Sequence, residues 1–160
     1  MLDVPNRKFG VADRASVAEL TGRAFLEGVM RGELPAPPMA KTLNFTLVEV
    51  GDGSVVFEGE PSEAFLNPMG AIHGGFALTL IDSAAGCAGM SLLPPGAAYA
   101  TIETKANFSR PITIATGRVR ADAKVVARGR RIMSAEARIT DAQGRVLAHG
   151  TSTLMVVTEG

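Results

Sequence analysis

The chain has 160 residues, of which 46% are hydrophobic and 20% charged, a composition typical of an ordinary globular protein. Lys and Arg together number 16, as do Asp and Glu, so the formal net charge is zero and no basic field favours nucleic acid or an anionic membrane as partner. A lone cysteine excludes an internal disulfide, and no signal-type or membrane-spanning segment is evident, so we expect a cytoplasmic protein.

The N-terminal region is predicted to form one amphipathic helix over residues 13–32. Asp13 or Ser16 is a suitable N-cap, and Gly32 is suited to end the helix. The three prolines of ELPAPPMAK then predict a connector without helix. We therefore expect residues 1–39 to be an N-terminal helix and connector, followed by the main domain over residues 40–160.

Two strands are predicted next, over residues 42–50 and 54–60, because apolar and polar side chains alternate in both. The tripeptide GDG between them is typical of a hairpin turn. Residues 74–90 follow as a helix that is apolar on nearly all sides, which indicates burial.

The remaining chain is predicted to be antiparallel sheet. Alternation predicts strands over residues 99–108, 118–127, 131–140 and 145–157, with one face of the first formed by Tyr99, Thr101, Glu103, Lys105 and Asn107. A long buried helix wrapped by such a sheet is the hotdog arrangement. We therefore predict an α+β hotdog fold with five to six strands and an extra N-terminal helix.

The glycine pair at the start of the central helix is the first candidate for chemistry. The leading amides of a helix lack intrahelical acceptors and carry partial positive charge. Gly74 and Gly75 have no side chains, so a substrate carbonyl could reach a bare N–H, as in an oxyanion hole. The alternative is that the pair only permits a tight turn and close packing.

Asp82, within the same helix, is the second candidate. Burial of a carboxylate is costly and raises its pKa, which suits a general base or nucleophile. The alternative is a carboxylate bonded to nearby hydroxyls or facing a wet groove. Gly74 and Asp82 are about 12 Å apart along one helix, so if both act on one carbonyl they must come from two chains. Antiparallel packing of two such helices predicts a homodimer with two-fold symmetry.

Other polar residues are weaker candidates. His73 is expected to order the loop, with a hydrogen bond to substrate as a further possibility, and His149 to lie on the sheet surface. The run Arg128-Gly129-Arg130-Arg131 could bind phosphate groups or be a solvated turn. Two histidines and one cysteine lack metal-ligand spacing, so we expect no metal site. Serine-elbow, dinucleotide and NTP motifs are absent.

Taken together, NPMGAIHGG at 67–75 and LID at 80–82 resemble the signature of PaaI-type hotdog thioesterases, which hydrolyse acyl-CoA. The likeness extends over about residues 40–157. It implies that Gly74 donates the N–H that polarises the thioester carbonyl and that Asp82 of the other subunit is general base or nucleophile. It also implies that Asn67 and His73 line the pocket, and that Thr101 orients water.

The resemblance further implies that Arg128, Gly129 and Arg130, with Arg131 beside them, contact the phosphates of coenzyme A, which is part of the substrate and not a cofactor. It implies a dimer, often paired into a dimer of dimers. We expect an aryl- or medium-chain acyl-CoA as substrate. A 3-hydroxyacyl thioester dehydratase or hydratase and a non-catalytic acyl-CoA-binding domain are the alternatives.

Overall fold

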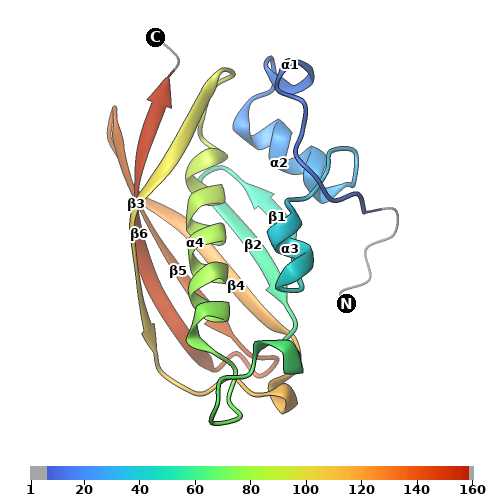
Figure 1. Ribbon diagram of the computed structural model, residues 1–160. Helices are drawn as coiled ribbons and strands as arrows, with labels where there is room; N and C mark the ends of the chain where they lie inside the picture. The colour runs from blue at the N-terminus through green and yellow to red at the C-terminus, as the bar shows by residue number, and fades with distance from the viewer. Residues whose placement is uncertain (1–6, 159–160) are drawn as a thin grey trace.

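The computed structural model describes residues 7–158 and contains one antiparallel sheet wrapped around a long helix (Figure 1). The first six residues of the segment predicted over 1–39 and the last two of the domain predicted over 40–160 lie outside the described residues. The strand order is β1-β2-β4-β5-β6-β3. The strands are β1 (Phe45–Gly51), β2 (Ser54–Gly59), β3 (Ala97–Phe108), β4 (Val119–Arg128), β5 (Ile132–Thr140) and β6 (Val146–Thr158).

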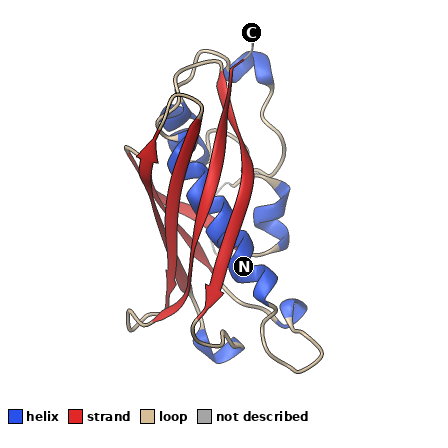
Figure 2. Cartoon of the chain, turned by 90° about the vertical axis from the view of Figure 1, so that its left-hand side faces the viewer, coloured by secondary structure: helices blue, strands red, loops and turns tan. Residues whose placement is uncertain are grey.

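The central helix α4 spans Gly74–Met90, the range predicted from the sequence. Its apolar side chains are buried against the sheet, and α4 contacts all six strands. Side chains with no exposed surface include Leu80, Ile81, Ala84, Ala85 and Ala88. Among residues 7–158, no helix covers the outer face of the sheet (Figure 2), so the predicted hotdog arrangement with six strands is confirmed. No helix within residues 7–158 is long and apolar enough to cross a membrane.

Alternating burial explains why the later strands pair as they do. In β4, Val119, Ala121 and Ala123 are buried on the face toward the core. The turn between β5 and β6 is built by Asp141, whose carboxylate accepts hydrogen bonds from the N–H groups of Gln143 and Arg145. The predicted strands and the DAQGR turn are therefore confirmed.

The N-terminal helix differs from the prediction. In place of one helix over 13–32, the structure has α1 (Arg14–Val17) and α2 (Gly22–Met30). Thr21 starts the second helix because its hydroxyl accepts a hydrogen bond from the N–H of Ala24. Gly22 packs so closely that an added Cβ would lie 1.9 Å from the carbonyl oxygen of Met90. The prediction of a single helix was wrong because it missed the Thr21 cap.

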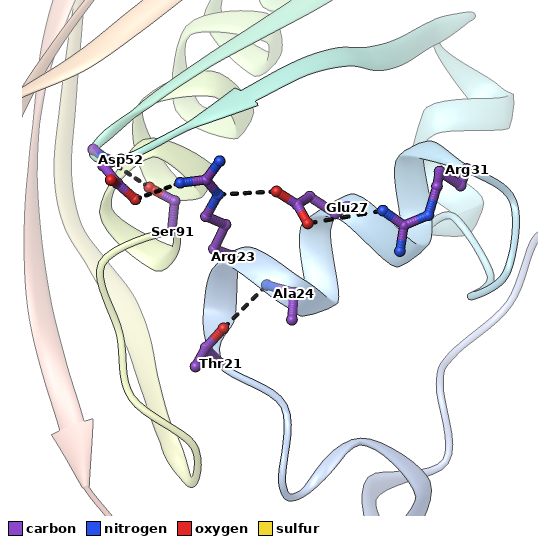
Figure 3. A network of polar contacts seen from close by, with 8 residues as sticks. Thr21, Arg23, Ala24, Glu27, Arg31, Asp52 and Ser91 are labelled. Carbon is purple, nitrogen blue, oxygen red and sulfur yellow. Dashed lines mark hydrogen bonds and ion pairs between the residues drawn. The ribbon is translucent and has the colours of Figure 1, made fainter.

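The proline-rich connector contains a short helix, α3 (Pro38–Thr42), which the sequence prediction excluded. Pro38 occupies the first turn, where its missing N–H costs no hydrogen bond. Helix α2 is joined to the β1–β2 turn through Arg23, which forms ion pairs with Glu27 at 2.9 Å and Asp52 at 2.8 Å (Figure 3). The three N-terminal helices lie on the same side of the sheet as α4 (Figure 1).

Strand β3 forms one edge of the sheet, and its alternation is interrupted. The register against β6 shifts between Thr101 and Glu103, which leaves Ile102 as a bulge. Tyr99 and Thr104 both reach α4, although they are an odd number of residues apart. The prediction that residues 99–107 share one face in strict alternation was therefore wrong past the bulge.

We expect Leu80→Ala to lower the free energy of unfolding by about 2–5 kcal/mol, because it empties a fully buried site under the sheet. Met69→Ala is the control, since that side chain is 90% exposed in a loop, and we expect a change within about 0.5 kcal/mol. Denaturant unfolding of both variants measures the difference. Equal losses would contradict the placement of Leu80 in the core.

Candidate active site

The N-terminus of α4 is capped by His73, whose Nδ1 accepts a hydrogen bond of 2.9 Å from the N–H of Gly75. The carbonyl of His73 accepts from the N–H of Phe76. Because Nδ1 accepts this hydrogen bond, Nε2 is the ring nitrogen that can carry a proton. His73 itself is exposed. The predicted structural role of His73 at the loop is confirmed, and its contact with substrate stays a prediction.

The N–H of Gly74 has no acceptor among residues 7–158. The ring of Phe108 lies against this residue, since a Cβ at Gly74 would be 3.0 Å from Phe108 Cζ. Gly74 is therefore a half-buried, unpaired donor at the positive end of a 17-residue helix. These are the properties that an oxyanion donor needs.

Asn67 shapes the loop that precedes α4. Its Oδ1 accepts hydrogen bonds from the N–H groups of Met69 at 2.9 Å and Ala71 at 3.2 Å. The backbone N–H of Asn67 donates to the carbonyl of Ala71, which closes the turn. This side-chain oxygen is thus engaged in the loop, and the role of Asn67 toward water or thioester stays a prediction.

Asp82 is partly buried and lies beside β3. Its Oδ1 accepts a hydrogen bond of 2.8 Å from the hydroxyl of Thr104, and Ser152 Oγ lies 3.0 Å from that hydroxyl. Ser152 in turn donates to the carbonyl of Glu103 at 3.1 Å. Within residues 7–158 no hydrogen bond engages Oδ2 of Asp82. The carboxylate is therefore held through one oxygen, while the other is available to water.

The sequence prediction missed Thr104 and Ser152. It placed Thr101 near the reacting water, but in the structure the threonine bonded to Asp82 is Thr104, three residues further along β3. The displacement follows from the bulge at Ile102, which alternation alone does not reveal. Thr101 is exposed, and its role with water stays a prediction.

Two further polar side chains, Cys87 and Tyr99, line one cavity together with Asp82. Burial, reinforced by the negative charge of Asp82, raises the pKa of Cys87 to about 12, although a hydrogen bond with Tyr99 opposes the shift. Burial, followed by the charges of Cys87 and Asp82, also raises the pKa of Tyr99. Both side chains are thus neutral at pH 7.

Gly74 and Asp82 lie eight residues apart on one straight helix, which separates them by about 12 Å. One chain therefore does not bring the two groups to a single carbonyl. Phe108 lies against Gly74, and Thr104 is bonded to Asp82, so the same separation is repeated along β3.

The arginine run lies at the β4–β5 turn, at the end of the sheet near the C-terminus of α4. Gly129 permits the turn, because an added Cβ would be 2.8 Å from the carbonyl oxygen of Ile132. Arg128 borders a depression with Leu92 and Pro94, whereas Arg130 and Arg131 border another one with residues 155–157. All three arginines are exposed, and their contact with phosphates stays a prediction.

His149 and a possible metal site are the remaining features considered in the sequence. His149 is exposed on β6, as predicted for the sheet surface. In the described part of the chain, no group of three or more His, Cys, Asp or Glu side chains could hold a metal ion.

Comparison with known proteins now supplies the family. The sequence profile of the thioesterase superfamily matches residues 69–148, which contain the loop, α4 and most of the sheet. The chain belongs to this superfamily and is a thioester hydrolase. A comparison with curated proteins gives no match.

Solved structures agree with this assignment. A thioesterase family protein from Silicibacter pomeroyi is 32% identical, with a TM-score of 0.71, covering 76% of this chain and 90% of its own. A phenylacetic acid degradation-related protein from Ralstonia eutropha JMP134 is 28% identical, with a TM-score of 0.75, covering 82% of this chain and 98% of its own. The E. coli PaaI protein, 23% identical with a TM-score of 0.69 over 75% of this chain and 84% of its own, supports the fold alone.

We expect Cys87 to react with iodoacetamide at pH 8 about three orders of magnitude more slowly than an ordinary thiol, because a pKa of about 12 leaves little thiolate. Between pH 7 and 10 the rate should rise about tenfold per unit without a plateau. Cys87 is the one cysteine of the chain, so mass spectrometry of the whole protein measures the rate. The control is the chain unfolded in urea. A plateau near pH 9 in the folded protein would contradict the buried placement.

Proposed function

We propose that this protein is an acyl-CoA thioesterase that hydrolyses an aryl- or medium-chain acyl-CoA to the free acid and coenzyme A. The observation that carries the proposal is that one helix presents two groups suited to thioester hydrolysis. These are the Gly74 N–H, which has no hydrogen-bond acceptor among residues 7–158, and the Asp82 carboxylate. The superfamily assignment supplies the reaction class. The Ralstonia eutropha protein, named for phenylacetic acid degradation, supports an aryl-acyl group as one candidate.

In the proposed reaction, the thioester carbonyl oxygen accepts a hydrogen bond from the Gly74 N–H. Asp82, acting as general base, removes a proton from water while the water oxygen bonds to the carbonyl carbon. The negative charge on the carbonyl oxygen is stabilised by the helix N-terminus. When the tetrahedral intermediate collapses, the carbon–sulfur bond breaks and the proton passes from Asp82 to the departing thiolate. In the alternative sequence, a carboxylate oxygen of Asp82 attacks the carbonyl carbon and the carbon–sulfur bond breaks, which releases coenzyme A as a thiolate that takes up a proton from water. Water then hydrolyses the mixed anhydride to the free acid and the Asp82 carboxylate.

Both groups act on one carbonyl only if two chains share each site, and the edge strand supports such a dimer. Strand β3 has 12 residues, and one of its edges pairs with no other strand of the described chain. Its side chains Ile102 (56%) and Phe108 (58%) are exposed. Antiparallel pairing of two β3 edges about a two-fold axis would place the two α4 helices antiparallel. Phe108 lies beside Gly74, and Thr104 lies beside Asp82. The two-fold axis would therefore pass near the residues midway between them, which are Ala106 on β3 and Leu78 on α4. The Leu78 side chain is 38% exposed.

We expect Asp82→Asn to lower kcat/KM by at least about 10²-fold, because the variant keeps the shape of the side chain and loses the base. Asp122→Asn, on the outer face of the sheet, is the matched control and should leave the activity unchanged. The measurement follows thiol release from a panel of benzoyl-, phenylacetyl- and C4–C12 acyl-CoA. The same panel includes hydration of an enoyl-CoA. Full activity of Asp82→Asn, or turnover by hydration alone, would overturn the proposal.

The oxyanion donor is tested at Gly74 with two substitutions. Gly74→Pro removes the N–H at the first helical position, where proline is tolerated, and should cost about 10²–10³-fold in kcat. Gly74→Ala adds a Cβ against Phe108 but keeps the N–H, so it should cost much less. Equal losses in the two variants would show that packing, not the amide, matters.

The sharing of sites is tested by mixing Asp82→Ala chains with Gly74→Pro chains. Mixed dimers hold one intact site, so a re-assembled equimolar mixture should regain about a quarter of wild-type activity. Subunit exchange is verified by native mass spectrometry of differently tagged chains. An absence of recovery in confirmed mixed dimers would rule out the shared site.

A further inference from the structure

An apolar cavity of about 370 Å³ adjoins Asp82. Its volume falls in the range of about 300–1,000 Å³ that small-molecule sites occupy. The walls come from α2, α4, β1, β2 and the segments around residues 7–12 and 35–38. The apolar side chains that line it include Phe25, Leu26, Val29, Phe45, Leu47 and Phe57. The N-terminal region, which lies outside the match to the superfamily, thus builds much of this cavity.

One cation, Arg7, also lines the cavity. One of its terminal nitrogens donates to Thr46 Oγ1, while its buried Nε has no hydrogen-bond acceptor among residues 7–158. The guanidinium carbon lies 5.9 Å from the centre of the Phe9 ring. Burial lowers the pKa of Arg7. A guanidinium has five donors and no acceptor capacity, so a ligand that pairs with the N–H groups of Arg7 in the cavity has to be an acceptor.

The charges around Arg7 indicate what kind of acceptor fits. Lys41 Nζ lies 6.0 Å from the centre of the same Phe9 ring, so two cations flank this part of the molecule. Asp82, whose Oδ1 is bonded to Thr104, is the one acidic residue among the described residues that line the cavity. A partly desolvated guanidinium pairs well with a carboxylate, which can accept two parallel N–H bonds.

We propose that this cavity receives the acyl group and that Arg7 binds a carboxylate at the far end of the acyl chain, so that the preferred substrates are ω-carboxyacyl-CoA thioesters. This inference rests on the proposed function, because it assigns the acyl pocket of the same site. Arg7 is a specificity residue in this account and takes no part in bond breaking at the carbonyl. The apolar walls hold the methylene chain between Asp82 and Arg7.

The experiment compares adipoyl-CoA with hexanoyl-CoA, which have the same number of carbons and differ in the terminal carboxylate. Wild type should favour adipoyl-CoA by at least about tenfold in kcat/KM, and Arg7→Met should abolish that preference. The loss should lie in KM, with kcat retained, because Arg7 does not contact the reacting carbon. Arg7→Lys should keep part of the preference, and Arg118→Met, an exposed arginine outside the cavity, all of it.

In the kinetic comparison, the inference would be overturned by a wild-type preference for hexanoyl-CoA, an adipoyl preference that survives Arg7→Met, or a stronger preference for 6-hydroxyhexanoyl-CoA. A calorimetric titration with free adipate and hexanoate separates this inference from the proposed function. Adipate that binds wild type but not Arg7→Met supports the carboxylate site even if no thioester is hydrolysed. Hydrolysis of hexanoyl-CoA without adipate binding overturns the carboxylate site and leaves the thioesterase standing.

Discussion

The burial of one long helix under a single sheet fixes the positions of the two groups to which we assign the chemistry of this protein. Helix α4 contacts every strand, and its apolar side chains are closely packed in the core. Gly74 and Asp82 are therefore held about 12 Å apart, and both remain partly accessible at the edge that β3 forms. A thioester carbonyl spans far less than that distance. If both groups act on one carbonyl, as we propose, a second chain has to complete each site, and the exposed β3 edge is the surface suited to supply it.

Much of this could be predicted from the sequence because the signals were local. The bounds of α4 follow from its continuous apolar run after HGG, and the later strands follow from alternation and turn residues. The remainder depended on contacts that no local pattern encodes. Because of the bulge at Ile102, Thr104 and not Thr101 is hydrogen-bonded to Asp82. Ser152, which contacts the Thr104 hydroxyl, is 48 residues away from it in the sequence. The Thr21 cap divided the N-terminal helix, and the proline at position 38 began a helix that the prediction excluded.

In our proposal, two parts of the chain contribute different features to the site. The loop, α4 and sheet within residues 69–148 carry the features common to the superfamily and, in our proposal, the hydrolytic groups. The segment before residue 45 contributes Arg7, Phe25 and Leu26 to the cavity beside Asp82. The ion pair between Arg23 and Asp52 connects helix α2 to the β1–β2 turn, but it is surface-exposed and therefore weak. The burial of Leu26 and Val29 contributes more to the free energy that holds α2 in place.

The most direct measurement of the central claim is a crystal structure with a non-hydrolysable acyl-CoA analogue in which a methylene group separates sulfur from the carbonyl. We expect a carbonyl oxygen about 3 Å from the Gly74 nitrogen of one chain, with the carboxylate of Asp82 from the other chain facing the carbonyl carbon. A carbonyl bound between groups of one chain only, or bound away from the N-terminus of α4, would contradict it.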